Sequence, residues 1–502
     1  MQEVHNPLYT EYQEIQQKAA DLNNASAVLS WDQEVYMPPK GASFRARQLA
    51  TLATQAHGLL TSAGYEKLLH ELSGQKDLPG MAKDNVRLSN EDLQKNKKLP
   101  SAFVDELSRL TSECFNAWVE ARKKDDYSVF APALSKMVSL KRKQADMYGY
   151  ENHPYDALLD EYEKGATISM LDPVFKKIRE DFPPLLDKIK AAPQVANDCF
   201  NKYYPAKTQW EFSLHVLDKM GFDFDAGRQD YSEHPFTTSF APADVRITTR
   251  VDENNFASLL WSSIHEGGHA LYEQGLPEDQ YGLPLGSAAS LSIHESQSRL
   301  WENCVGRSFG FWKFFYPELQ KYFPRQLEPV SLDTFYKAMN RVTPSLIRTE
   351  ADEITYHFHV MIRYEIEKAL IEGSLQPAGL RDKWNELYGQ YLGIKPKTDV
   401  TGVLQDVHWS HGSFGYFPTY TLGSFYAAQF YSQAAKEIND FPTQITKGAF
   451  DPLLKWLCEK VHQHGRRYTS EELCRNITGQ KLDPSFFMRY VNEKYAGIYG
   501  IK

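Results

Sequence analysis

The chain has 502 residues, of which 42% are apolar, so it is long enough to bury a large hydrophobic core. Its 56 basic and 65 acidic side chains give a formal net charge of −9. This mildly acidic balance argues against nucleic acid or an anionic membrane as the main partner. The five cysteines are widely spaced, which favours a reducing compartment. With no signal peptide and no transmembrane run recognisable in the sequence, we expect a cytoplasmic protein without a membrane partner.

Most of the sequence has apolar residues three and four positions apart with charged residues between them, which is the pattern of amphipathic helices. The stretches that we expect to be helical are 8–28, 43–73, 101–124, 130–148, 172–190 and 207–220. Residues 95–100 predict a solvated turn, and Ser101 predicts the N-cap of the helix that follows. Since no repeat and no linker divides the sequence, we expect a single domain over residues 1–502.

One stretch departs from the helical pattern. Between residues 221 and 253 the apolar positions alternate, which predicts a small β-sheet inserted in a helical body. The residues on one face of the expected strand are Val245, Ile247, Thr249 and Val251. An edge strand of such a sheet could pair with an extended peptide.

The segment that follows, residues 256–275, predicts a helix that carries His265, Glu266 and His269. The two histidines are four positions apart, so both imidazoles project from one helix face and can reach one Zn²⁺ at about 2.0–2.1 Å. Glu266 can accept a proton from a metal-bound water without taking a ligand position. Gly267 and Gly268 each cost about 1 kcal/mol inside a helix. They indicate either the close approach of another group or tight helix packing.

A catalytic zinc ion takes three protein ligands and keeps one position open. Glu295 lies 295 − 269 = 26 positions after His269, on a helix predicted over residues 290–302. A turn between Gly282 and Gly286 allows this helix to return antiparallel and bring Glu295 to the metal. His294 and Glu302 are alternative ligands, and we interpret Glu302 as a surface charge.

The same residues belong to a larger set of motifs. In chain order these are Leu29-Ser30-Trp31-Asp32-Gln33, Met37-Pro38-Pro39, His234-Pro235-Phe236, Asp244-Val245-Arg246-Ile247-Thr248, the segment from His265 to His269, His294-Glu295-Ser296-Gln297, Ile347-Arg348-Thr349-Glu350-Ala351-Asp352, and Gly402-Val403-Leu404-Gln405-Asp406-Val407-His408-Trp409. With these motifs the chain resembles the thermostable carboxypeptidase Taq family of metallocarboxypeptidases (peptidase family M32), over essentially its whole length.

The resemblance implies a mainly α fold. It implies one helical body whose two lobes flank a deep active-site cleft, as in neurolysin and angiotensin-converting enzyme, with the small β-sheet near the metal helix. It also implies a zinc-dependent homodimer, in which Co²⁺ can substitute for Zn²⁺, that removes single residues from peptides with a free C-terminus and has broad specificity. His265, His269 and Glu295 carry over as metal ligands, and Glu266 carries over as the general base.

Two arginines and one histidine are candidates for binding the substrate. Arg348 falls in the first turns of a long helix predicted from Thr343 to Gly373. The residues alone favour an ion pair with a nearby acidic group, whereas the resemblance links this segment to recognition of the C-terminal carboxylate. We interpret Arg246 as structural because Asp244 and Glu253 are near in sequence, and His234 is a candidate through its motif. The acidic residues considered as partners of Arg348 are Glu350, Asp352 and Glu353.

The segment from His408 to Tyr420 is rich in hydrogen-bond donors. Peptide hydrolysis needs a donor aimed at the developing oxyanion, and Tyr420 is the first choice. His408, His411 and Tyr416 are candidates to assist it, and core packing is the alternative for each aromatic residue.

Two other functions fit part of the same pattern. One is an endopeptidase or dipeptidyl carboxypeptidase of the same helical group. The other is a peptide-binding protein that has lost catalysis, but the retention of Glu266 argues against it, because a binding module needs no base beside the metal.

Overall fold

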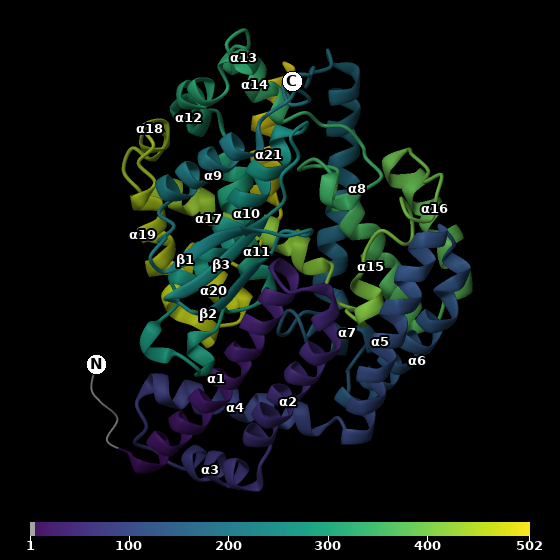
Figure 1. Ribbon diagram of the computed structural model, residues 1–502, viewed down its shortest axis with the longest axis vertical. Helices are drawn as coiled ribbons and strands as arrows, with labels where there is room; N and C mark the ends of the chain where they lie inside the picture. The colour runs from purple at the N-terminus through teal and green to yellow at the C-terminus, as the bar shows by residue number, and fades with distance from the viewer. Residues whose placement is uncertain (1–5, 502) are drawn as a thin grey trace. The chain divides into compact units, whose positions relative to one another are not determined.

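The computed structural model describes residues 6–501 as helices with one three-stranded sheet (Figure 1), which confirms the mainly α fold class. The chain forms two compact units, each assembled from three separate stretches. The first unit contains the described residues up to Gln94 together with Asn197–Met339 and Ala427–Leu482. The second contains Lys95–Ala196, Asn340–Tyr426 and residues from Asp483 onward. The single domain over residues 1–502 and the cleft remain predictions.

The first unit holds the sheet and the HExxH helix. Its helices are α1 (Pro7–Val35), α2 (Ala42–Leu60), α3 (Ala63–Ser73), most of α4 (Gly80–Lys97), α9 (Ala206–Met220), α10 (Phe256–Gln274), α11 (Leu291–Arg299), α12 (Phe309–Tyr322), α13 (Pro324–Leu327), α14 (Leu332–Met339), α18 (Phe441–Thr446), α19 (Asp451–Lys460) and α20 (Ser470–Thr478). A π-helix over Leu300–Gly306 continues α11 directly. The α17 helix (Pro418–Glu437) contributes residues to both units.

The sheet lies beside α10 (Figure 1) and has the strand order β1-β3-β2. β1 (Gly227–Tyr231) pairs parallel with β3 (Asp244–Thr249), and β2 (Thr237–Ala241) pairs antiparallel with it. Val245, Ile247 and Thr249 of β3 are fully buried, as the alternating pattern predicts, whereas Val251 lies beyond the end of the strand. β2 is therefore an edge strand of this sheet and packs on α10.

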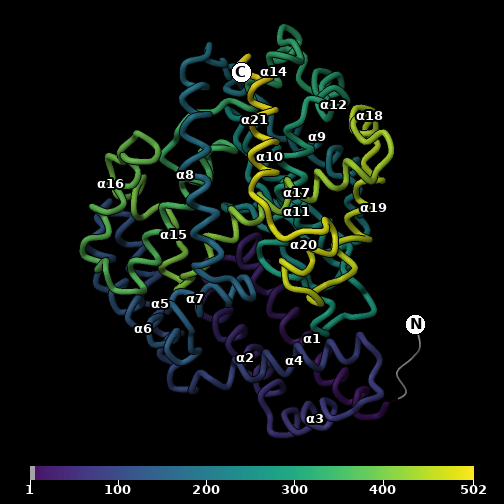
Figure 2. Tube along the Cα trace, turned by 180° about the vertical axis from the view of Figure 1, so that it is seen from behind, coloured from purple at the N-terminus to yellow at the C-terminus, as the bar shows by residue number. Residues whose placement is uncertain are grey.

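The second unit is built from helices that pack on one another. They are α5 (Ser101–Lys124), α6 (Ala131–Tyr148), α7 (Pro154–Leu159), α8 (Ile168–Ala191), α15 (Tyr356–Glu372), α16 (Leu380–Leu392) and α21 (Ser485–Tyr499). The C-terminal helix α21 packs on α8 (Figure 2), and α15 contacts α6, α7 and α16. Two 3₁₀ turns, Arg348–Glu350 and His408–His411, carry predicted site residues.

Most of the predicted helices are confirmed, and three local expectations are wrong. The 43–73 stretch is two helices that break at Thr61 and Ser62, because the Ser62 side chain caps α3. Residues 95–97 are the last turn of α4, where lysines stabilise the negative helix end. The N-cap position of α5 is Pro100, so Ser101 is the first helical residue.

Helices α10 and α11 approach each other closely at Gly268. A Cβ atom on Gly268 would lie 2.7 Å from Cα of Ser298 and 2.8 Å from the carbonyl oxygen of Gln297, both backbone atoms of α11. A Cβ atom on Gly267 would meet the ends of two flexible side chains, Cδ2 of Leu217 at 2.5 Å and Cε of Met220 at 3.6 Å. The packing interpretation of the two glycines is therefore confirmed, and at Gly268 it concerns the helix that carries Glu295.

Replacing Gly268 with Ala is expected to push α11 away from α10, because backbone atoms cannot yield as a side chain does. We expect a loss of about 1–3 kcal/mol in the free energy of unfolding, the usual range for overpacking, together with weaker metal binding. Gly267→Ala is the matched control and should keep metal affinity within a few-fold of wild type. Denaturant unfolding and competition with a chelator measure both quantities. Equal metal affinity in the two variants would contradict this role of Gly268.

Candidate active site

The packing of α10 on α11 brings three predicted metal ligands together. Nε2 of His269 lies 3.4 Å from Oε2 of Glu295, and Nε2 of His265 lies 3.7 Å from the same oxygen. These donor atoms all lie within 4.8 Å of one another. Within residues 6–501 they are the one group of three potential ligands at such distances. Two imidazoles and one carboxylate are a donor set typical of catalytic zinc sites.

The outer nitrogens of both histidines already have partners. Nδ1 of His265 lies 2.9 Å from Oε2 of Glu302, and Nδ1 of His269 lies 2.6 Å from Nδ1 of His294. A histidine that uses Nδ1 in this way presents Nε2 to a metal. Both Nε2 atoms face Glu295, so the hydrogen bonds as well as the distances fit a metal ion at this place.

Glu302 is not a surface charge, and that prediction is wrong. Its side chain is only 9% exposed, and it accepts hydrogen bonds from Arg299 and Arg307 as well as facing His265. The π-helix that follows α11 carries it to this place. The sequence pattern gave no signal for this position, because the π-helix changes the residue spacing after α11.

Arginines compensate the charge of the two buried carboxylates. Nε of Arg299 donates to Glu295 at 2.6 Å, and its Nη1 donates to Glu302 at 3.2 Å. Burial alone would raise the pKa of both carboxyls, but Arg299, assisted by the adjacent His265, holds each pKa far below its usual range. Both groups are therefore ionised, as a metal ligand and its supporting acceptor need to be.

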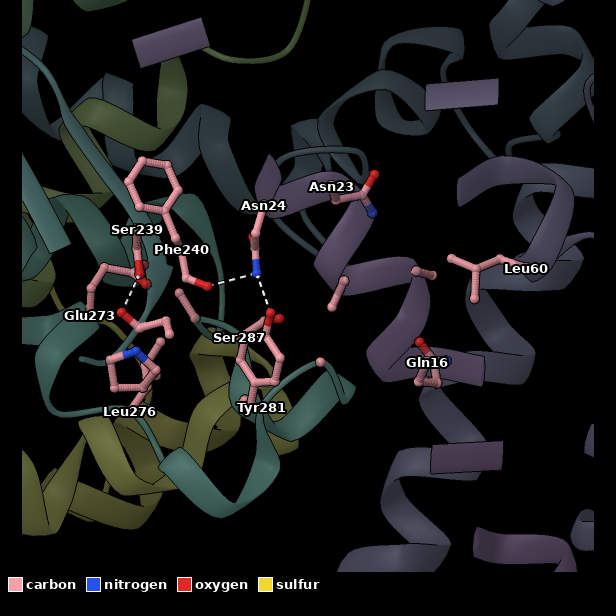
Figure 3. Close-up of a pocket in the computed structure, with 17 residues that line it drawn as sticks. Gln16, Asn23, Asn24, Leu60, Ser239, Phe240, Glu273, Leu276, Tyr281 and Ser287 are labelled. Carbon is pink, nitrogen blue, oxygen red and sulfur yellow. Dashed lines mark hydrogen bonds between the residues drawn. The ribbon is translucent and has the colours of Figure 1, made fainter. Parts of the chain in front are cut away.

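His294 contacts His269 and lies outside the group of three potential ligands. Its Nε2 lies 2.7 Å from Oε1 of Glu273, which also bonds with Ser239 on β2 (Figure 3). The chain of contacts therefore runs from Glu273 through His294 to His269. Glu273 lines a cavity of about 360 Å³ between α1, the end of β2 and the turn after α10.

Glu266, the predicted base, is buried on α10 and faces β2. Oγ1 of Thr237 lies 2.6 Å from its Oε2. The carboxylate is thus held next to the ligand group by a residue that no motif singled out.

Arg348 belongs to the second unit and lies outside any long helix, so its expected place in the first turns of a helix is wrong. The helix α15 begins only at Tyr356, because the carboxylate of Asp352 accepts the backbone N–H groups of Ile354 and Thr355 and so favours a helix start after it. Arg348 is 6% exposed, and its ion-pair partner is Asp406.

Asp406 is held between two guanidinium groups. Nε of Arg348 donates to Oδ1 at 3.0 Å, and Nε of Arg363 donates to Oδ2 at 2.7 Å. Burial alone would raise the pKa of Asp406, but Arg363 and Arg348 hold it far below its usual range. Two cations on one anion leave this buried group with a net positive charge. Its surroundings are aromatic, since the Arg348 guanidinium carbon lies 4.8 Å from the ring centre of Tyr420 and Nη1 bonds with Tyr356.

His408 and Tyr420 are hydrogen-bonded to each other in the same unit, with 3.1 Å between Nε2 and the hydroxyl. The ring of Tyr416 lies 5.2 Å from His408 and 5.3 Å from Tyr420. Burial, reinforced by Arg348, lowers the pKa of His408 to about 3, so the imidazole is neutral at physiological pH. His411 takes no part in this hydrogen bond. It is exposed and stacks on Phe115 of α5.

The remaining two candidates lie around the sheet. Arg246 donates two hydrogen bonds to Asp244, and its guanidinium carbon lies 4.4 Å from the ring centre of Trp31. This pairing fits the structural interpretation of Arg246, whereas Glu253 bonds with Tyr203 and the backbone of Ala206 instead. The His234 side chain is exposed, and its carbonyl accepts a hydrogen bond from Ser232.

Residues 11–495 match the family described as carboxypeptidase Taq (M32) metallopeptidase. The chain belongs to this family. Carboxypeptidase 1 of Bacillus subtilis is 39% identical over 491 residues, covering 97% of this chain and 98% of that protein. Thermostable carboxypeptidase 1 of Thermus thermophilus is 40% identical over 505 residues, covering 98% and 99%. The crystal structure of an M32 carboxypeptidase from Deinococcus radiodurans matches with a TM-score of 0.97 at 39% identity, covering 99% of this chain and 100% of that one.

Membership in this M32 family confirms the resemblance found in the motifs. It makes the protein a peptide hydrolase of the carboxypeptidase class with a metal cofactor.

Replacing Glu302 with Gln is expected to weaken metal binding about 10- to 100-fold, the usual effect of changing a residue that orients a metal ligand. The amide keeps the shape of the side chain but removes the charge that faces His265 and both arginines. Titration with a competing chelator measures the dissociation constant. Glu328→Gln, which changes an exposed glutamate of the same unit, is the control and should leave it unchanged. An unaltered constant in the Glu302 variant would show that Glu302 does not support the metal.

Proposed function

We propose that this M32 peptidase holds one zinc ion between His265, His269 and Glu295 and removes single residues from peptide C-termini. The observation that carries the proposal is the convergence of both Nε2 atoms on Oε2 of Glu295, beside a buried glutamate. When bound, zinc supplies a Lewis acid that polarises the peptide carbonyl and lowers the pKa of a water molecule. Co²⁺ shares this chemistry and is proposed as a substitute.

Glu266 takes the role of general base. It directly follows His265 in sequence, its side chain is buried, and its carboxylate accepts a hydrogen bond from Thr237 that fixes its direction. It accepts the proton of the attacking water and returns a proton to the leaving amine. These two proton transfers need one carboxyl group that alternates between its ionised and protonated forms.

Arg348 takes the role of reading the C-terminal carboxylate. A free carboxylate differs from an internal peptide group by its charge, and a planar guanidinium can bind both oxygens. Arg363 also pairs with Asp406, so the two arginines carry one positive charge more than Asp406 neutralises, which supports this role.

Tyr420 takes the role of stabilising the oxyanion, with His408 as its hydrogen-bonded partner and Tyr416 beside them. A phenol donates to a developing negative charge at no cost in reorganisation when it is already positioned. His411, Arg246 and His234 are retained only as candidates for contacts with longer peptides, because the structure gives them no link to these groups.

The substrate class is peptides with a free C-terminus, cleaved with broad preference. A homodimer and a cytoplasmic location follow from the family resemblance and from the cysteine pattern, and they stay proposals. Within residues 6–501 no helix is both long and apolar enough to cross a membrane.

Glu266→Gln should retain the metal and the fold but lower kcat by roughly 10²–10⁴-fold, because the amide cannot accept a proton. The measurements are turnover of a short acylated peptide and metal content of the same sample. Near wild-type turnover in a metal-loaded variant would remove Glu266 from the role of base.

Arg348→Ala should lower kcat/KM by roughly 10²-fold or more, since a charge-assisted hydrogen bond in a buried place is lost. The wild-type enzyme should also fail on peptides whose C-terminus is amidated. Mass spectrometry of one digested peptide should show a ladder of single-residue losses from the free acid and none from the amide. Equal cleavage of both forms, or internal cuts, would favour the endopeptidase alternative and leave Arg348 as an ion-pair partner only.

A further inference from the structure

A hydrogen bond links the hydroxyl of Thr237, on the edge strand β2, to the carboxylate of Glu266, the proposed general base. Oγ1 of Thr237 lies 2.6 Å from Oε2 of Glu266 and 3.0 Å from the carbonyl oxygen of the same residue. A hydroxyl has one proton, and a charged acceptor forms the shorter and stronger bond. The proton therefore points to the carboxylate.

The strand holds this hydroxyl in a fixed place. Phe236, the residue before Thr237, donates its N–H to Oγ1 of Thr248 at 3.0 Å and accepts the N–H of Thr248 at 2.9 Å. Thr237 itself is in register with Ile247 of β3, which is fully buried. Because threonine is branched at Cβ, its side chain also has few rotamers. The flexible side chain of Glu266 is therefore hydrogen-bonded to the short side chain of Thr237, which has few accessible rotamers.

The alternation along β2 explains why this residue and not its neighbour meets the base. Side chains two positions apart share one face of a strand. Thr237 and Ser239 face α10, where the first bonds with Glu266 and the second with Glu273 (Figure 3). Those two glutamates are seven positions apart on α10 and so also share a face. Thr238 lies between the two hydroxyl residues and points the other way.

We propose that Thr237 is a positioning residue for catalysis, which holds the carboxylate of Glu266 in the direction needed to accept a proton from water. The inference rests on the proposed role of Glu266 as general base. It predicts that the hydroxyl, and not the bulk of the side chain, is what turnover depends on.

The test compares three single variants of the full-length, zinc-loaded protein on one short acylated peptide with a free C-terminus. Thr237→Val keeps the shape and removes the hydroxyl, and it should lower kcat about 10- to 100-fold with KM within twofold of wild type. Thr237→Ser keeps the hydroxyl and should restore kcat to within a few-fold of wild type. Thr238→Val removes a hydroxyl from the same strand and should leave kcat unchanged. Metal affinity and melting temperature should match wild type in all three.

Several results would overturn the inference. They are a Thr237→Val variant with wild-type kcat, a Thr237→Ser variant as slow as Thr237→Val, or a loss of kcat that follows a loss of metal or of thermal stability. The Glu266→Gln background separates this failure from failure of the proposed function. If Glu266→Gln is inactive while Thr237→Val is normal, only the positioning role fails. If Glu266→Gln is itself active, the proposed base fails. If the positioning role and the base role are both correct, the double variant Thr237→Val/Glu266→Gln should be as active as Glu266→Gln alone.

Discussion

The close approach of α10 and α11 at Gly268 is the contact on which the candidate metal centre depends. A side chain there would collide with the backbone of α11, so glycine is what lets the helix bearing His265 and His269 lie against the helix bearing Glu295. Glycine lowers the stability of the α10 helix at this position, and the buried packing of α10 on α11 offsets that loss. The three donor atoms, their supporting groups and the direction of Glu266 all follow from this one contact and from the sheet that packs on α10.

Buried carboxylates pair with arginines in each unit. Around the candidate metal ligands, Arg299 bonds with both Glu295 and Glu302, and Arg307 adds a second cation beside Glu302. In the second unit, Arg348 and Arg363 flank Asp406. Removing one partner of such a group leaves an uncompensated charge in a poorly solvated place, which is strongly destabilising. These arginines therefore maintain the fold as well as the local potential, and variants of them need a stability measurement beside any rate.

The sequence was sufficient for features that follow from local spacing. The helix of the HExxH motif, the strand with Val245 and Ile247 on its buried face, and the proximity of Glu295 to both histidines were all predictable from periodicity and turn length. Partners distant in sequence were not predictable in this way. Arg348 pairs with Asp406, 58 positions away, rather than with the acidic residues beside it, and Thr237 reaches Glu266 across 29 positions. Glu302 was misassigned because its place depends on a π-helix, which the apolar pattern does not reveal.

The most direct test of the account is to locate the metal by anomalous scattering in crystals of the zinc-loaded protein. One anomalous peak is predicted at about 2.0–2.2 Å from Nε2 of His265, Nε2 of His269 and a carboxylate oxygen of Glu295. The Nδ1 atoms should keep their contacts with Glu302 and His294. A peak bound through either Nδ1 atom, or one that takes Glu302 in place of Glu295, would contradict the account.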